Sequence, residues 1–379
     1  MYFVEKTKGL NFFKHFDFTL LTEILLLSLA GLFILFSALK YDNSEKRLIV
    51  QAVALILGII IAFIISAIDY KDFKILGWLF YFISLILLVY VIKKGVGLEQ
   101  MGANSWIVIP VIGSFQPSEL SKITFIIVIA VLLEKLKESQ EYKFKDILKI
   151  FVIAAMPIGL VILQPDFGTA MVFIFILVVM LFAFGIKYKY LFAAFIASIP
   201  ASAFTWFFLL NEKRKERILT FLSPGSDPQG AGYQVIRAIR TIGSGQMFGK
   251  GWLQGPQTLR GTVPERATDM IFTVVCEQFG FIGAVLLMIL ICAILMHCLY
   301  VARNSRDLFG SYVVVGLTAM LGFHFFFNIG VCIGIFPVSG IPLPFISSGG
   351  SATITNFISI GIILSVSMRR KRAIFNNSQ

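Results

Sequence analysis

Carboxylates at the start of apolar segments are the side chains of this sequence best suited to chemistry. Asp269 follows Glu265 by four residues, where a long polar segment gives way to an apolar run. If a helix begins early here, both carboxylates lie on one of its faces. Asp269 then serves as a general base at the edge of the membrane, or Thr268 and Asp269 simply cap the helix. We favour the first interpretation, because the segment before Asp269 differs from the rest of the chain.

Glu119 and Lys122 form a second candidate group. They stand three residues apart at the start of an apolar run, so a helix would pair them on one face. Ionisable groups in such runs are costly and point to function by default. Either the ion pair fixes helix packing, or the lysine faces a cavity and binds a phosphate; we favour the second. Glu277, two turns beyond Asp269, fits a buried structural partner and a site residue equally well.

Three further polar positions border apolar runs. Asp166 precedes one, where capping is the stronger interpretation and substrate contact the second. Trp106, near a glycine, would anchor at the membrane interface or stack on a sugar, and the former is more common. Ser347, Ser348 and Gly349 follow helix-breaking prolines and precede the last apolar run. Their backbone N–H groups could bind an anion, or the small residues could allow close helix packing.

The apolar runs between these residues predict a membrane protein. Of 379 residues, 58% are hydrophobic and 14% charged, a balance that no soluble domain of this size has. A spanning helix needs about 20 apolar residues. The sequence therefore predicts one all-α polytopic membrane domain over residues 1–379, with a large extracytoplasmic loop at 211–269 between the seventh and eighth spans. The ten predicted spans are about 18–40, 48–68, 75–92, 117–134, 147–163, 168–186, 190–210, 270–300, 308–335 and 350–368.

The net charge of +12 is explained by membrane topology rather than by nucleic acid. An even number of spans places both termini on one side, and basic residues, including the cluster at 369–372, concentrate on that side. The positive-inside rule makes that side the cytoplasm. The unusual segments around Trp106, Glu119, Asp166, Asp269 and Ser347 then all face outward, which predicts a single extracytoplasmic site.

The long loop has an internal pattern of its own. Tyr233, Ile236 and Ile239 alternate with polar residues at helical spacing, which predicts a short helix on the membrane surface, with Arg237 and Arg240 toward lipid headgroups. The glycines at 243, 245, 249 and 251 predict a mobile lid. The four cysteines and three histidines have no metal-binding or disulfide spacing.

In this order, the motifs resemble those of the SEDS family (shape, elongation, division and sporulation), and among its members RodA. The matching segments are 102–106, 116–122, 164–169, 221–222 with 227–228, 230–235, 242–245, 249–251, 264–265 with 268–269, and 337–351. The resemblance implies a ten-span glycosyltransferase of the bacterial cytoplasmic membrane that polymerises lipid II into peptidoglycan during cell elongation. It also implies that Asp269 is the essential carboxylate. The implied partners are a class B penicillin-binding protein and other membrane proteins of the elongation complex.

Under this resemblance, one base is enough for the reaction. The leaving group of lipid II is a polyprenyl pyrophosphate, so no acid must protonate the departing oxygen, whereas glycosidases need a pair of carboxylates. Asp269 would deprotonate the acceptor 4-hydroxyl, and a single displacement would invert the anomeric carbon. Lys122, oriented by Glu119, would stabilise the pyrophosphate. No cofactor is predicted with a defined ligand set, although Mg²⁺ or Mn²⁺ could neutralise the same charge. We expect substrate contacts from Glu119, Lys122, Trp106, Asp166, Glu265, Glu277, Ser347, Ser348 and Gly349.

Two other classes of function remain open on sequence grounds. A lipid II flippase would need the same lipid groove and buried charges, but also working groups near the membrane midplane and on both faces. A non-catalytic scaffold for a transpeptidase would need no base at Asp269.

Overall fold

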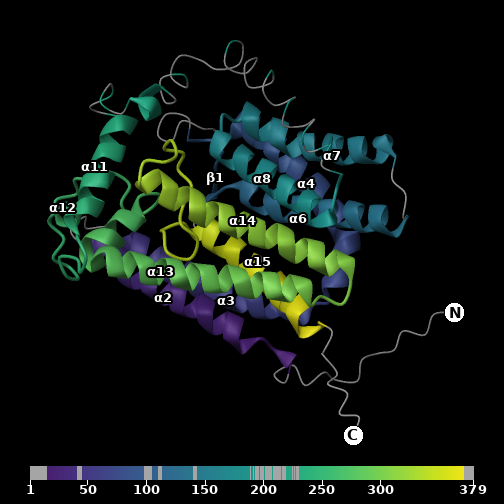
Figure 1. The fold of residues 1–379 in the computed structure, drawn as a ribbon, viewed down its shortest axis with the longest axis horizontal. Coiled ribbons are helices and arrows are strands. Elements are labelled where there is room, and N and C mark those ends of the chain that lie inside the picture. The colour runs from purple at the N-terminus through teal and green to yellow at the C-terminus, as the bar shows by residue number, and fades with distance from the viewer. Residues whose placement is uncertain are drawn as a thin grey trace, which may run out of the picture.

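The computed structural model describes residues 15–40, 45–97, 105–109, 113–139, 143–187, 189–190, 219–223, 225, 227 and 230–370, with isolated positions between 191 and 218. The chain forms a bundle of long helices that run side by side (Figure 1). Within the described ranges, eight helical segments are long and apolar enough to cross a membrane. They are α2 (Phe18–Leu39), α3 (Glu45–Ala67), η1 (Tyr70–Asp72) joined to α4 (Phe73–Lys94), α7 (Phe144–Leu163), α8 (Phe167–Phe184), α13 (Ile271–Arg303), α14 (Leu308–Cys332) and α15 (Gly350–Met368).

The predicted all-α polytopic class is confirmed, and the helix ends lie close to the predicted ones. A further long helix, α6 (Pro117–Glu138), has the length of a span but carries more charged residues than the eight. The predicted seventh span at 190–210 falls largely outside the described residues, so the total of ten remains a prediction. A short antiparallel hairpin, which was not expected, precedes α6; its strands are β1 (Ile107–Ile109) and β2 (Gly113–Phe115).

Helices α3 and α15 approach each other closely through small residues. A Cβ atom added to Gly361 on α15 would lie 3.0 Å from the Cα of Ala62 on α3. Where two membrane helices meet, small side chains allow this approach, and dispersion contacts then hold the pair. Most of the remaining surface of α3 is exposed and apolar, as a lipid-facing helix requires.

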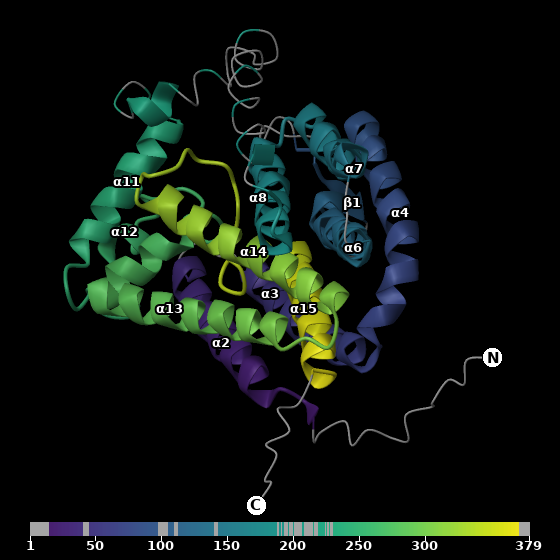
Figure 2. The same ribbon diagram turned by 45° about the vertical axis from the view of Figure 1, so that its right-hand side comes forward.

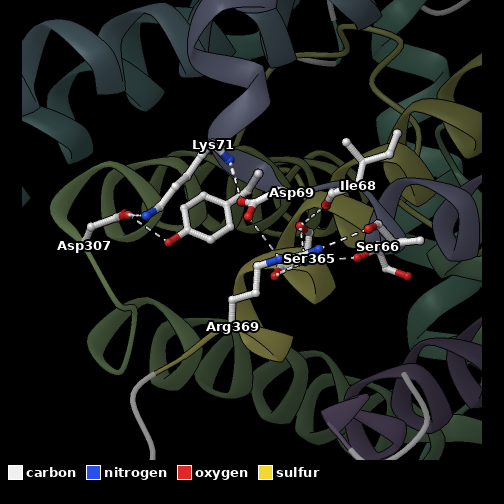
Figure 3. Close-up of polar contacts among 9 residues, drawn as sticks. Ser66, Ile68, Asp69, Lys71, Asp307, Ser365 and Arg369 are labelled. Atoms are coloured by element: carbon white, nitrogen blue, oxygen red, sulfur yellow. Dashed lines mark hydrogen bonds and ion pairs between the residues drawn. The ribbon is translucent and has the colours of Figure 1, made fainter. Parts of the chain in front are cut away.

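One end of this helix pair is fastened by Arg369, at the C-terminus of α15 (Figure 3). The guanidinium donates to the carbonyl oxygens of Ser66 at 3.3 Å and Ala67 at 3.0 Å, which are among the last of α3. It also lies 3.5 Å from a carboxylate oxygen of Asp69. Arg369 thus satisfies carbonyls that a helix end leaves without partners. This arginine, which the sequence placed in a basic cluster on the predicted cytoplasmic side, joins α15 to α3.

Asp307 fastens the neighbouring helix at the same end of the bundle (Figure 3). Its Oδ1 accepts the backbone N–H of Gly310 at 2.8 Å and so caps α14. Its Oδ2 accepts the Tyr70 hydroxyl at 2.9 Å and lies 3.7 Å from the Lys71 ammonium. The connection between α3 and α4 is therefore tied to the start of α14.

Helix α13 is broken at Gly280, whose φ of 66° and ψ of −162° are open essentially only to glycine. Residues 246–251 lie against the break and supply the missing hydrogen bonds. Lys250 N donates to Glu277 O at 2.9 Å, and Phe281 N donates to Gln246 O at 2.8 Å. Cβ atoms on Gly245 and Gly249 would collide with the carbonyls of Cys276 and Gln278. Two of the four glycines from which a mobile lid was predicted, Gly245 and Gly249, therefore permit tight packing against α13, which argues against a lid that moves freely here.

The helix expected within the long loop exists as α11 (Ala231–Ser244), followed by the short α12 (Pro256–Leu259). The buried face of α11 differs from the predicted one. Val235, Ala238 and Thr241 are buried, whereas Ile239 is largely exposed. Arg237 lies over the ring of Tyr233, with 5.0 Å between the guanidinium carbon and the ring centroid. Both helices lie beside the N-terminal end of α13, away from the end where α2 begins and α15 stops (Figure 2).

Candidate functional site

The turn that carries Asp269 precedes α13 rather than belonging to it. Because α13 begins at Ile271, Glu265 and Asp269 do not share a helical face, contrary to the expectation of an early start. Glu265 has a φ of 51°, and Met270 N donates back to its carbonyl at 3.1 Å. The two carboxylates nevertheless lie on either side of one hydroxyl, because Thr268 Oγ1 is 2.9 Å from Glu265 Oε2 and 3.1 Å from Asp269 Oδ1.

Asp269 does not cap α13, since the N-cap residue is Met270 and no side chain bonds there. The Asp269 residue is only 7% exposed, and among the described residues no cation forms an ion pair with it. The pKa of its carboxyl is raised to about 6, mainly by burial and to a smaller extent by the charge of Glu265, while hydrogen bonds from the Asp269 backbone and the Thr268 hydroxyl oppose the shift. A carboxyl in this range can take up a proton near neutral pH, as a general base must.

The backbone of this turn is held from two sides. On α14, Asn328 Nδ2 donates to the carbonyl oxygens of Asp269 and Ile341, each at 2.8 Å. From the segment before α15, the Ser347 hydroxyl donates to Thr268 O, and Ser348 N donates to Ala267 O at 2.8 Å. Three carbonyls in a row, from Ala267 to Asp269, therefore have partners in other elements.

The serine–glycine segment is thus a support for the Asp269 turn. Ser348 N is engaged by Ala267, and Gly349 N donates to Gln51 Oε1 of α3 at 3.0 Å. Ser347 Oγ also accepts Leu343 N at 2.9 Å. Ser347 N in turn donates to Leu343 O at 3.0 Å. All three N–H groups expected to bind an anion therefore donate to protein acceptors already, which argues against that prediction.

Glu119 and Lys122 form the predicted ion pair, with 2.8 Å between Lys122 Nζ and Glu119 Oε1. The expectation of a lone cation facing a cavity is wrong, because Lys122 is only 1% exposed and has a second partner. His324 Nε2 lies 2.9 Å from the same Nζ, and His324 Nδ1 lies 2.7 Å from Met320 O. Since a lysine ammonium only donates, Nε2 must accept and Nδ1 must carry the proton.

Helix α14 links this buried group to Asp269. His324, which contacts Lys122, and Asn328, which contacts Asp269, are four residues apart on α14. They therefore lie on one face, separated by about 6 Å along the axis. The two main groups of the predicted site are therefore linked through neighbouring positions of α14.

Asp166 and Trp106 occupy the neighbouring elements. Asp166 caps α8 by accepting Thr169 N at 3.0 Å, and it also accepts Gln116 Nε2 at 3.0 Å from the start of α6. Burial raises the pKa of Asp166, although hydrogen bonds from Thr169 oppose that shift. Trp106 is half-buried and pairs with Val96 through two backbone hydrogen bonds. Capping at Asp166 agrees with the favoured interpretation.

Glu277 is fully buried and holds the loop instead of facing the Asp269 turn. Its carboxylate accepts Gln257 N at 2.7 Å, Thr258 N at 2.8 Å and the Thr258 hydroxyl at 2.5 Å. These groups belong to α12, whose first N–H groups lack partners within the helix. The contacts favour the structural interpretation, and a substrate contact by Glu277 remains a prediction without direct support.

Asn328, His324 and Gln51 are site residues that sequence reasoning missed. All three are polar residues within apolar runs, which is a signal that marks candidate functional positions. In the part of the chain that the structure describes, no group of three or more His, Cys, Asp or Glu side chains is placed to hold a metal ion. Glu265 and Asp269 provide two carboxylates beside one hydroxyl.

Comparisons with known proteins agree with this geometry. The family model for FtsW/RodA/SpoVE cell cycle proteins matches residues 17–372. The chain is 32% identical to the peptidoglycan glycosyltransferase MrdB of Escherichia coli K12, over 94% of this chain and 95% of that protein. It is 34% identical to stage V sporulation protein E of Bacillus subtilis, over 93% and 96%.

Solved structures give the same result. A chain from a peptidoglycan synthase complex that coordinates polymerization and crosslinking is 29% identical, with a TM-score of 0.79 over 93% of this chain and 97% of that chain. The rod shape determining protein RodA of Thermus thermophilus is 26% identical, with a TM-score of 0.70 over 94% and 98%. With a family model covering most of its length and relatives above 30% identity along nearly all of it, the chain belongs to the FtsW/RodA/SpoVE family.

Proposed function

We propose that this protein is a peptidoglycan glycosyltransferase that polymerises lipid II, with Asp269 as its general base. Family membership and the names of the relatives support the reaction class. The observation that supports the role of Asp269 is its carboxyl, buried without a cation among the described residues and held on a fixed turn, with a pKa of about 6. A base with a pKa near the working pH is most effective at proton transfer.

In the proposed reaction, the 4-hydroxyl oxygen of the acceptor sugar attacks the anomeric carbon of the donor. The bond from that carbon to the pyrophosphate oxygen breaks, and the acceptor proton moves to Asp269. One displacement inverts the anomeric centre. The pyrophosphate leaves as an anion and needs no proton, so a single carboxylate suffices, in contrast to the pair that glycosidases use.

Supporting roles are assigned more narrowly than in the sequence-based prediction. Lys122 is enclosed by Glu119 and His324, so a direct contact with pyrophosphate would require one of these partners to move. A role in positioning α14, and through it Asn328, accounts for the observed contacts. Glu265 and Asp269 supply only two carboxylates. A Mg²⁺ or Mn²⁺ ion held by them would take its remaining ligands from substrate phosphates and water.

We infer that the protein acts at the outer face of the cytoplasmic membrane, with both termini in the cytoplasm. The one-sided distribution of the candidate site and of the basic residues supports this orientation. A class B penicillin-binding protein is the proposed partner during cell elongation, together with other membrane proteins of that complex. The similarity to a chain from a peptidoglycan synthase complex supports such an assembly.

The test is polymerisation of labelled lipid II by purified protein with its transpeptidase partner, resolved as glycan ladders on a gel. We expect Asp269→Asn to fold and elute normally but to make no ladder. Asp72→Asn is a matched control, because Asp72 is an exposed carboxylate directly before a helix and makes no capping bond.

Normal ladders from Asp269→Asn would overturn the assignment of the base. Flipping of lipid II across liposomes without any polymer, by the unaltered protein, would favour a transporter. A strain carrying Asp269→Ala that keeps its shape would favour a scaffold.

A further inference from the structure

The segment between α11 and α12 exposes large apolar side chains. Phe248 is 82% exposed and Met247 55% exposed, next to the glycines that pack against the break in α13. Trp252, on the same segment, is 37% exposed. Side chains of this size rarely stand free in water as a group, so a patch of them marks an interaction surface.

The patch is continuous with the exposed face of a membrane helix. The ring of Trp252 stacks on Phe33 of α2, with 4.3 Å between centroids and 10° between planes, and lies 6.1 Å from Phe36. Phe33 stands about 9 Å along the axis from Leu39, where α2 ends. Helix α2 is about 33 Å long, which matches the hydrocarbon thickness of a bilayer. Trp252 therefore lies below the outer end of a span.

The backbone of this segment meets the requirement for entering lipid. A backbone group without a hydrogen bond is costly in hydrocarbon. Here Gly249 N donates to Gly245 O at 2.8 Å, and Gly251 N donates to Gln278 O at 3.0 Å. The break in α13 in turn uses carbonyls of the segment, because Ile282 N donates to Met247 O at 3.2 Å. The segment and the broken helix satisfy each other.

We propose that residues 247–252 insert into the outer leaflet of the membrane and contact lipid acyl chains near the headgroups. An exposed lysine, Lys250, and the exposed Trp252 directly follow the apolar residues at 247 and 248, as in an interfacial anchor. The same segment is hydrogen-bonded to α13 through Lys250 N and Glu277 O, two turns after Asp269. Insertion thus fixes the height of the Asp269 turn relative to the bilayer surface, where the headgroup of a lipid-linked substrate lies.

The test is fluorescence quenching in reconstituted vesicles. In one variant, phenylalanine replaces the other three of the four tryptophans, so that Trp252 is the sole tryptophan. In a second variant, phenylalanine replaces all four, and Phe248→Trp then makes position 248 the sole tryptophan. Vesicles contain phosphatidylcholine brominated near the headgroup end of its acyl chains. We expect both reporters to lose most of their emission in brominated vesicles and to resist aqueous iodide. The matched control is Gln254→Trp as the sole tryptophan, with the four native ones replaced by phenylalanine, at an exposed polar position of the same loop, which iodide should quench.

Quenching of position 248 by iodide but not by brominated lipid would overturn the proposal, because the patch would then face water. Protection from both quenchers would also overturn it, since a protein surface would then cover the patch. The Trp252 reporter leaves the loop sequence unchanged, so it remains informative if Phe248→Trp does not fold.

Discussion

Asn328 Nδ2 lies 2.8 Å from the carbonyl oxygen of Asp269, although 59 residues separate them in the sequence. The same amide reaches Ile341 O, so one buried side chain joins the Asp269 turn to the segment that precedes α15. The proposed base is positioned through its backbone, and its carboxylate is left available for substrate.

Asn328→Asp should therefore lower polymerisation activity, although the Asp269 side chain itself is unchanged. Aspartate keeps the shape but removes both donors, so Asp269 O retains only the weak Cys332 thiol donor at 3.5 Å and Ile341 O loses the Asn328 amide. A buried carbonyl left without a partner costs about 1–3 kcal/mol. A shift of about 1 Å in the base can reduce the rate on the order of 100-fold. Rates and melting temperatures should both fall. Asn304→Asp is the control, because that amide serves one exposed carbonyl. An unchanged rate for Asn328→Asp would contradict the positioning role.

Polymerisation should depend on pH through Asp269. With a pKa of about 6, the carboxyl is protonated and inactive in mild acid, so initial rates should rise through pH 6 and level off above it. Because the charge of Glu265 raises this pKa, Glu265→Gln should move the midpoint to lower pH. A midpoint that stays in place in Glu265→Gln would show that another group controls the profile.

Asp269→Asn should stabilise the fold at neutral pH. The carboxyl has a higher pKa folded, about 6, than the value of 3.8 expected when unfolded. Its favourable contribution is complete below pH 3.8 and is lost as pH rises through 6. Above pH 6 the amide should gain up to about 3 kcal/mol over the ionised carboxylate. Melting curves from pH 4 to 7 would measure a gap that widens with pH; a constant gap would contradict the burial argument.

The Glu119–Lys122 pair should behave as a structural unit. Removing one partner of a buried pair costs about 3–5 kcal/mol, whereas an apolar replacement of both is often tolerated. Lys122→Met should be severely unstable, and Glu119→Leu with Lys122→Met should recover much of the loss. Activity of the recovered double variant separates the two roles. Ladder formation would support positioning, and a stable but inactive protein would support pyrophosphate binding by Lys122.

Gly280→Ala should disrupt the break in α13. The backbone there adopts a conformation that costs other residues about 1–3 kcal/mol, and a Cβ would also meet the backbone of residues 247–249. Gly243→Ala is the control, because a Cβ there meets no atom within 4 Å and the residue lies in α11. That change should be neutral or stabilising. Comparable melting temperatures for both variants would contradict the account of the break.

The spans and the Glu119–Lys122 pair could be predicted because their signals are local. Apolar runs of fixed length define spans, and three-residue spacing on a helix brings two side chains together. The contact between Asn328 and Asp269 could not be predicted, since it depends on how α14 and the turn pack. For the same reason the burial of Lys122 against His324 was missed, and the lysine was expected to face a cavity.

The glycines at 245 and 249 show a different limit. Glycine allows mobility, and it also allows another backbone to approach without a side chain between them. Composition is the same in both cases, and only the position of α13 decides between them. The same ambiguity affected Glu277, whose carboxylate holds α12 from two turns beyond Asp269.

The break at Gly280 separates α13 into two parts with different roles. Residues 281–303 rise about 34 Å, which is enough to cross the hydrocarbon without help. The nine residues before the break, 271–279, therefore do not need to match the thickness of the bilayer. Contacts with other protein segments alone can set the direction of these nine residues. A change in the lipids around residues 281–303 would then leave the geometry of the Asp269 turn unaltered.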